Sequence, residues 1–158
     1  MRSLVVYDSV FGNTEEIARA IAGVLASAGE VKAARVGDVD QGDLEGIDLL
    51  VVGSPTRAFR ATPATMTFVK GLPPDALARV RVAAFDTRVD VAQVGNRFLT
   101  FMVKLFGYAA KPIAEGLEKR GGVRAAVPEG FFVSDKEGPI TEGERNRAEG
   151  WARSLTSE

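Results

Sequence analysis

The stretch from Leu4 to Thr14 reads LVVYDSVFGNT, and it predicts the first unit of the fold. Its first four residues form a compact apolar run rich in β-branched and aromatic side chains, as in a buried strand. The turn-prone pair Asp8-Ser9 ends this run. A helix is predicted to follow, because apolar residues recur along one of its faces: Ile17, Ile21, Val24, Leu25 and Ala28.

The ends of the predicted helices carry capping signals. Asn13 is predicted as the N-cap of the first helix, with Glu16 three residues later as in a capping box, and Gly29 is predicted to end it. The last helix is predicted to start at Thr141 in the same way, with Glu144 three residues later.

The alternation of strand and helix patterns continues to the end of the chain. Further strands are predicted at residues 31–36, 49–52, 80–85 and 123–127, the last extended by 131–133. A short helix or turn is predicted at 41–46, and longer helices from the capped pair Thr62-Pro63, over Asn96–Arg120 with a break at Gly107 or Pro112, and near the C-terminus.

Five strands, each followed by a helix, imply a parallel sheet with helices on both faces. The strands at 4–7 and 49–52 are the most apolar and the strands at 31–36 and 123–127 are more polar, which places the latter two at the edges. We therefore predict the α/β class, as a three-layer doubly wound sandwich with a five-stranded parallel sheet of order 2-1-3-4-5. Residues 1–158 are predicted to form one domain.

Composition narrows the chemistry that the chain can perform. Hydrophobic residues make up 46% and charged residues 26%, as in ordinary globular proteins, while histidine and cysteine are absent. Serine–histidine triads, cysteine nucleophiles, thiolate zinc sites, haem held by His or Cys and disulfides are therefore excluded. No metal site and no catalytic side chain is predicted, which leaves hydroxyls, carboxylates, Lys/Arg, backbone amides or a cofactor.

The charge and the apolar segments bear on partners and location. A formal net charge of −1 gives no global attraction to nucleic acid or to an anionic membrane. The longest apolar stretch, Phe98–Ala110, contains Lys104 and is shorter than a membrane span, and residues 1–12 lack the apolar region of a signal peptide. We predict a cytoplasmic protein with no nucleic-acid partner and no membrane span.

In sheets of the predicted order, ligands bind beyond the carboxyl ends of the strands where the strand order reverses. Here this rule selects the loops at 9–14, 54–61 and 86–95. The first loop combines hydroxyls, a glycine and the free amides of a helix N-terminus, which form a phosphate cradle without a basic residue. The chain has neither the nucleoside triphosphate motif nor the dinucleotide motif, so a phosphate monoester fits better. The alternative is a capped turn with no ligand.

Two motifs carry a resemblance to a known family. Ser9–Thr14 resembles the [ST]-x-[ST]-G-x-[ST] loop with which flavodoxins hold the FMN phosphate. Gly53–Arg57 is similar to the flavin-contacting loop of the same fold. Its closest likeness is the G-[ST]-P-T-R-F loop of tryptophan-repressor-binding-type NAD(P)H:quinone oxidoreductases, with Ala58 inserted before Phe59. The order of predicted elements matches flavodoxins across nearly the whole chain.

The resemblance implies FMN as cofactor and a set of residues that bind it: Ser9, Val10, Phe11, Gly12, Asn13, Thr14, Pro55, Thr56, Arg57, Ala58, Phe59, Thr87 and Arg88. Two features depart from the flavodoxin pattern. Phe11 replaces a hydroxyl residue, and the loop at 86–95 has no Tyr to stack on the flavin. Phe59 is the best remaining stacking residue, with an apolar loop anchor as its alternative, while Trp151 is predicted to lie in the core.

The predicted flavin loops are rich in cations, with four arginines against two aspartates: Arg57, Arg60, Arg88, Arg97, Asp86 and Asp90. One cation about 8 Å from a reduced flavin would favour its anion by up to ~2 kcal/mol at an effective dielectric constant of about 20. This corresponds to at most roughly 100 mV in a one-electron couple. The hypothesis is a flavin potential less negative than in flavodoxins, with arginines that could also dock a nicotinamide phosphate. The alternative is that these arginines are only solvated.

The run Phe98–Phe106 is apolar nearly all round if it is helical. It predicts a core helix covered by residues 107–113, a homo-oligomer interface, or an apolar lip for a quinone-like substrate. The favoured function is an FMN-binding electron carrier, because the chain is short and no proton donor stands out. The alternatives are a small FMN-dependent NAD(P)H–quinone oxidoreductase and a flavin-free partner module of the same fold. The predicted partners are a redox protein or an NAD(P)H- or quinone-like molecule.

Overall fold

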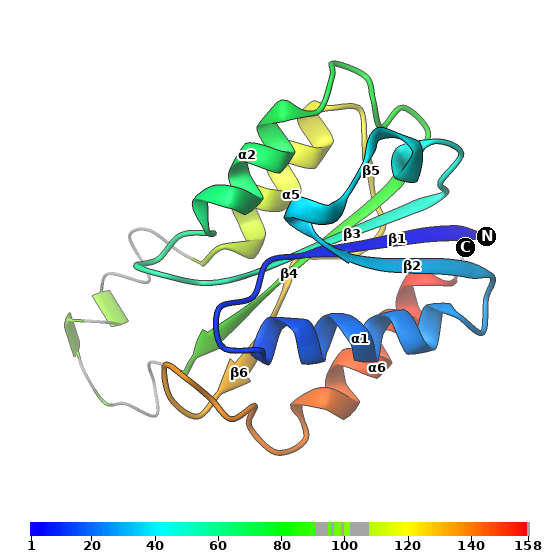
Figure 1. Cartoon of the computed structure of the whole chain (residues 1–158). Coiled ribbons are helices and arrows are strands. Elements are labelled where there is room, and N and C mark those ends of the chain that lie inside the picture. Colours follow the sequence, from blue (N-terminus) through cyan, green and yellow to red (C-terminus); the bar gives the residue numbers. More distant parts are fainter. Residues whose placement is uncertain (91–94, 96, 99, 102–107, 158) are drawn as a thin grey trace.

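The computed structural model describes residues 1–90, 95, 97–98, 100–101 and 108–157. Its strands are β1 (Arg2–Tyr7), β2 (Glu30–Arg35), β3 (Leu49–Pro55), β4 (Arg81–Val89), β5 (Val123–Arg124) and β6 (Glu129–Val133). Its helices are α1 (Asn13–Leu25), α2 (Pro63–Gly71), α5 (Ala110–Lys119) and α6 (Glu144–Leu155), with short 3₁₀ turns η1 (Val36–Asp38) and η2 (Gln41–Leu44). Figure 1 shows the sheet between two helical layers, with α2 and α5 on one side and α1 and α6 on the other.

The sheet confirms the predicted strand order. Its strands run β2-β1-β3-β4-β5 and every pair is parallel, with β6 also paired to β4. The predicted fifth strand was wrong in one respect, because it is divided into β5 and β6 rather than continuous to Val127. Pro128 lies at the division, where its missing N–H cannot contribute to a ladder. As a result, β6 continues the sheet at the end where the ligand loops leave it.

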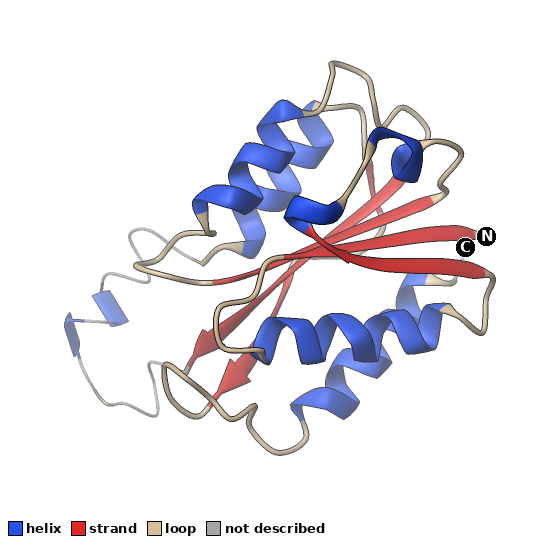
Figure 2. Ribbon diagram, viewed as in Figure 1, coloured by secondary structure: helices blue, strands red, loops and turns tan. Residues whose placement is uncertain are grey.

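The central strands are buried on both faces, as their unbroken apolar sequences predict. In β1, Leu4 and Val6 pack into the core under α2 and α5, whereas Val5 packs into the core under α1 and α6. Figure 2 shows the helices covering both faces of the sheet. This two-sided burial positions the strand ends, and so the loops that follow them, on a rigid base.

Both predicted ends of the first helix, and one of the two breaks proposed for the helix at 96–120, were wrong. Asn13 is the first helical residue and Gly12 is the N-cap, with a left-handed φ of 95° that favours glycine. α1 ends at Leu25, before Gly29. Pro112 does not break a helix, because it lies in the first turn of α5, where its missing N–H has no intrahelical partner to lose.

The rest of the predicted helix at 96–120 lies largely outside the described residues, and Gly107 with it. The predicted cap at Thr62 is confirmed, since its side chain accepts a hydrogen bond from the amide of Thr65 and Pro63 opens α2. Trp151 packs against the core formed with α1 and α6, as expected.

Glu144 does not form the predicted capping box with Thr141. It begins α6, and Gly143 is the N-cap. The Glu144 carboxylate accepts a hydrogen bond from the amide of Phe132 at 2.8 Å and pairs with Arg147 at 2.6 Å. The hydrogen bond from Arg147 is the main reason that the pKa of Glu144 lies below its ordinary value, while partial burial opposes this shift. The residue therefore ties α6 to the β6 strand.

An aromatic cluster fills the core beside β3 and β4. The rings of Phe85, Phe131 and Trp151 meet edge to face, with centroids 6.0–6.2 Å apart. Gly53 lies next to Phe85 in the β3–β4 pairing, and a methyl group at Gly53 would overlap the Phe85 ring. The glycine is therefore required by close packing and not by its backbone conformation.

Substitution Gly53→Ala is expected to destabilise the protein by about 2–3 kcal/mol, because the buried ring of Phe85 has no room to move. Gly150→Ala is the matched control, since no atom lies within 4 Å of its added methyl group and α6 gains helix propensity of roughly 0.5–1 kcal/mol. Urea unfolding of both variants measures the difference. Equal stability of the two variants would contradict the packing argument.

The substitution Glu144→Gln tests the link between β6 and α6. Because the pKa of Glu144 is lower in the folded state than in the unfolded state, the carboxylate stabilises the fold above the unfolded pKa, and this stability is lost as the pH falls through the folded pKa. We expect a loss of roughly 1–2 kcal/mol at neutral pH that shrinks at acid pH. Thermal unfolding against pH measures it, with exposed Glu142→Gln as control; a loss independent of pH would contradict the ionic explanation.

Candidate functional site

The loops after β1, β3 and β6, together with the ends of β4 and β6, line one cavity of about 370 Å³, a volume within the range of small-molecule sites. Its lining residues lie at or beyond the carboxyl ends of these strands. In Figure 1 the arrowheads of β4 and β6 point to this edge of the sheet. All but two of the predicted binding residues line the cavity, namely Ser9, Val10, Phe11, Asn13, Thr14, Pro55, Thr56, Arg57, Ala58, Thr87 and Arg88. Gly12 and Phe59 do not.

The first loop presents a set of hydrogen-bond donors. The Oγ atom of Ser9 accepts hydrogen bonds from the amides of Gly12 and Glu15 at 3.1 and 3.3 Å. The amides of Asn13 and Thr14 open α1, and within the described part of the chain no acceptor bonds them. Such amides, at the positive end of a helix, bind anions. The loop can therefore hold a phosphate monoester.

A network behind the loop fixes its shape. Arg35 of the edge strand β2 donates to the carbonyl oxygen of Ser9 at 3.2 Å and pairs with Glu15 at 3.1 Å. Glu15 also accepts from Arg19 and from the hydroxyl of Tyr7, both at 3.0 Å. These hydrogen bonds, that from Arg19 foremost, lower the pKa of Glu15. No local sequence pattern indicates this network, because its members come from β1, α1 and β2.

The second loop turns tightly between Arg57 and Arg60, whose backbones bond each other at 2.8 and 3.0 Å. The two residues at its tip, Ala58 and Phe59, have left-handed φ values of 48° and 67°. Neither is glycine, so each costs of order 1 kcal/mol that the surrounding structure must offset. The tip is thus held in a conformation that its own residues do not favour.

Among the described residues, Phe11 lines the cavity and Phe59, predicted as the stacking residue, does not. The guanidinium carbon of Arg57 lies 5.7 Å from the centre of the Phe11 ring, so the first and second loops touch across the cavity. Phe11 is 44% exposed. A planar ligand would meet an aromatic ring supplied by the phosphate loop itself.

The first loop is also joined to β4. The hydroxyls of Thr14 and Thr87 are hydrogen-bonded at 2.8 Å, and both residues are buried. The amide of Thr56 donates to the carbonyl oxygen of Thr87 at 2.9 Å, which brings the second loop to the same point. β4 continues to Val89, so the loop predicted at 86–95 begins later than expected and Thr87 belongs to the strand. Thr87 therefore connects the end of β4 with the first and second loops.

Arg88 is not a free cation beside the cavity. Its guanidinium makes two hydrogen bonds of 2.7 Å to Asp86, which is fully buried and also accepts from the amide of Ala110 at 2.9 Å. Burial raises the pKa of Asp86, and the pairing with Arg88 opposes this rise. The charge hypothesis must be corrected here, because the charge of Arg88 is balanced by its own partner.

Arg88 is held on two more sides. The ring of Tyr108 stacks on its guanidinium, with the carbon of that group 3.6 Å from the ring centre. On another side, a methyl group at Gly130 would overlap the guanidinium, so β6 approaches closely only because this residue is glycine. Tyr108 lies beyond the loop at 86–95, and nothing in the sequence pairs it with Arg88.

Three lining residues were missed by the sequence analysis, namely Val89, Val133 and Lys136. Val133 ends β6, and Lys136 lies in the loop between β6 and α6. Both became site residues because β6 is a separate strand beside β4. The predicted extension at 131–133 includes Val133, but as a continuation of the strand at 123–127 and not as a separate strand paired with the end of β4, so neither residue was expected at the site.

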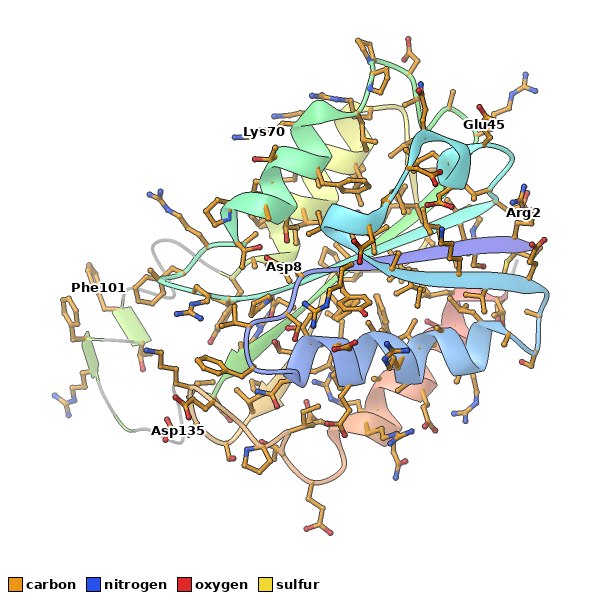
Figure 3. The ribbon with its side chains drawn as sticks, in the orientation of Figure 1. Arg2, Asp8, Glu45, Lys70, Phe101 and Asp135 are labelled. Carbon is orange, nitrogen blue, oxygen red and sulfur yellow. The ribbon has the colours of Figure 1, made fainter. Side chains whose placement is uncertain are left out.

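The apolar run Phe98–Phe106 is described only in part. Phe98 and Phe101 are 66% and 59% exposed, so these two side chains do not belong to the predicted core helix. Figure 3 shows Phe101 at the margin of the molecule, away from the sheet. In the part of the chain that the structure describes, no helix is long and apolar enough to cross a membrane, and no cluster of acidic residues could hold a metal ion.

Comparisons with known proteins identify relatives. A model of the flavodoxin domain family matches residues 4–118. No curated protein sequence is similar enough to count as a match. Among solved structures, oxidised Flavodoxin 2 from Bacillus cereus is similar with a TM-score of 0.76 at 23% identity, over 98% of this chain and 97% of that chain.

Two further structures are similar over 98% of this chain. Oxidised Flavodoxin 1 from Bacillus cereus has a TM-score of 0.76 at 18% identity, with 97% of its chain covered. A flavodoxin described as a WrbA-like protein, from Agrobacterium tumefaciens, has a TM-score of 0.71 at 15% identity, with 94% of its chain covered. At such identities these likenesses concern the fold alone.

The buried pair can be tested by removing one or both of its members. Arg88→Ala is expected to cost about 3–5 kcal/mol of unfolding free energy, because it leaves the Asp86 carboxylate buried without a counter-ion. The double variant Asp86→Asn with Arg88→Gln is expected to cost clearly less, since no charge remains buried. Denaturant unfolding measures both. If the double variant is as unstable as the single one, the pair does not act through its charges.

Proposed function

The chain belongs to the flavodoxin domain family, and on that premise we propose that it is an electron-transfer protein that binds FMN in the cavity of about 370 Å³ beyond β1, β3 and β4. Family membership implies a flavin cofactor. The observation that carries the choice of FMN is the pair of amides at Asn13 and Thr14, which has no acceptor within the described chain and opens a helix at the wall of that cavity.

The residues present fit a flavin with one terminal phosphate. Gly12 turns the chain into α1 with its left-handed φ, and Ser9 holds the loop in place through two backbone amides. The cavity of about 370 Å³ suits a flavin mononucleotide, and the sequence has no dinucleotide motif that would bind a second phosphate and an adenosine. The phosphate would lie at the start of α1, held by the loop from Ser9 to Thr14.

The remaining walls suit a flat ring system. Pro55 to Ala58 would line one side and Thr87 and Arg88 the other, with Phe11 at the mouth. Val89 and Val133 add apolar surface that excludes water from one end. The bound flavin supplies the redox chemistry, and the protein supplies its position and its surroundings.

The charges near the cavity support a carrier. The carboxylates of Asp86 and Glu15 are each committed to an arginine, so neither is poised to deliver a proton. Arg57 lines the cavity and forms no ion pair among the described residues, and Arg88 is neutralised. Of these two residues, only Arg57 therefore acts as a positive charge on a reduced flavin. One such charge raises the flavin's reduction potential by roughly 100 mV or less.

A small FMN-dependent NAD(P)H–quinone oxidoreductase is the second candidate. It is favoured by Arg57, which lies at the cavity beside an exposed aromatic ring and could receive a nicotinamide phosphate. The Pro55-Thr56-Arg57 sequence, similar to that of the quinone oxidoreductases, points the same way. In both candidates the flavin carries the electrons.

Flavin binding tests the proposal directly. Protein purified without added cofactor is titrated with FMN and with riboflavin, and the absorption of the desalted protein is recorded. We expect one FMN to be retained, bound at least about tenfold more tightly than riboflavin, because charge-assisted hydrogen bonds to a phosphate contribute roughly 1.5–3 kcal/mol. No retained flavin, even from excess FMN, would contradict the proposal and favour the flavin-free partner module.

A second measurement separates the two flavin functions. FMN-loaded protein is mixed anaerobically with NADH or NADPH while the flavin absorption is followed. A carrier is expected to be reduced slowly by the free nucleotides, since it takes electrons from a protein. Rapid bleaching followed by quinone-dependent turnover would identify the oxidoreductase instead.

A further inference from the structure

This inference rests on the proposed FMN site. We infer that Lys136, in the loop between β6 and α6, binds the FMN phosphate and supplies the cation that the first loop lacks. The sequence of Ser9–Thr14 contains no basic residue, so the loop by itself offers only amides and hydroxyls. Lys136 lines the same cavity as Ser9, Asn13 and Thr14. The contacts of its neighbours in the loop show that it lies near the start of α1.

The loop that carries Lys136 is anchored on the start of α1. The side-chain amide of Asn13 donates to the carbonyl oxygen of Glu137 at 3.1 Å, although the two residues are 124 positions apart. Gly138 packs against the same side chain so closely that a methyl group there would lie 2.6 Å from the Oδ1 atom of Asn13. Lys136 thus lies next to a residue that touches the first helical turn, whose free amides form the proposed phosphate site.

The loop is also rigid enough to select which side chain meets the cavity. The amide of Gly138 donates to the carbonyl oxygen of Asp135 at 2.9 Å, and the amide of Ser134 donates to that of Pro139 at 2.9 Å. The carboxylate of Asp135 accepts from the amide of Lys136 at 2.7 Å. Among the three consecutive charged residues 135–137, only the lysine lines the cavity. Figure 3 labels Asp135 on this loop.

Two of the other cations around the site are paired with carboxylates, Arg35 with Glu15 and Arg88 with Asp86. Arg57 forms no ion pair among the described residues, but it belongs to the second loop, where its guanidinium lies over the ring of Phe11. Within the described chain, no carboxylate forms a salt bridge with Lys136. A phosphate dianion at the start of α1 would give it a partner, in an exposed pair whose strength depends on salt.

The test compares FMN with riboflavin in Lys136→Gln, by flavin fluorescence quenching at low and high salt. Because riboflavin lacks the phosphate, the substitution is expected to weaken FMN binding about three- to fivefold at low salt and riboflavin binding less than about twofold. The FMN effect should shrink at high salt. Lys136→Arg should restore most of the affinity, because it keeps the charge.

The matched control is Lys119→Gln, which removes the same charge from α5 on the opposite face of the sheet. It should leave both affinities unchanged. Equal weakening of FMN and riboflavin by Lys136→Gln, no effect on FMN, or an equal effect of the control would each overturn the inference. If the wild-type protein binds FMN normally in those cases, the proposed function stands without Lys136. If the wild type binds no FMN at all, the proposed function falls first and the inference with it.

Discussion

The loops after β1 and β3 leave the sheet toward opposite faces, because α1 covers one face and α2 covers the other (Figure 1). Adjacent parallel strands whose helices diverge cannot close the space between their ends, and a hollow remains there. Every feature of the site depends on this constraint. The Thr14–Thr87 hydrogen bond and the bond from Thr56 to Thr87 define the floor of the hollow. The strand order produces the hollow, and the first loop contributes the backbone amides of Asn13 and Thr14 that face it.

Electrostatics then divides the residues around the hollow into two groups. One group is matched in ion pairs and holds backbone rather than ligand: the buried pair Asp86–Arg88, and Arg35, which is exposed, with the partly buried Glu15. The cations left for a ligand are exposed, which keeps their influence modest and dependent on salt. A count of arginines in the sequence overstates the positive potential for this reason. What matters is whether each cation has a partner in the fold.

The fold and most of the site could be predicted because both follow from local pattern and from one topological rule. Apolar runs identified the strands, their relative polarity identified the edges, and the reversal of order selected the loops. Lys136 and Tyr108 could not be predicted in this way. Lys136 reaches the cavity through a contact between Asn13 and Glu137, and Tyr108 reaches Arg88 across residues with no periodic signal. The errors at Asn13 and Glu144 arose because glycine took each cap, which freed both side chains for long-range contacts.

The walls of the cavity differ in how firmly they are held, and this difference bears on function. The first loop is fixed by side chains of β2 and α1, and the loop after β6 is fixed against Asn13. The second loop is closed by backbone bonds between Arg57 and Arg60 and contacts the first loop through Arg57 and Phe11, while Ala58 and Phe59 have left-handed φ values. Strain of this kind persists only where the surrounding structure holds it, and it is found most often at sites that bind ligands. A rigid phosphate end joined to a strained ring end would keep a flavin bound while its exposed edge adapts to the molecule that exchanges electrons with it.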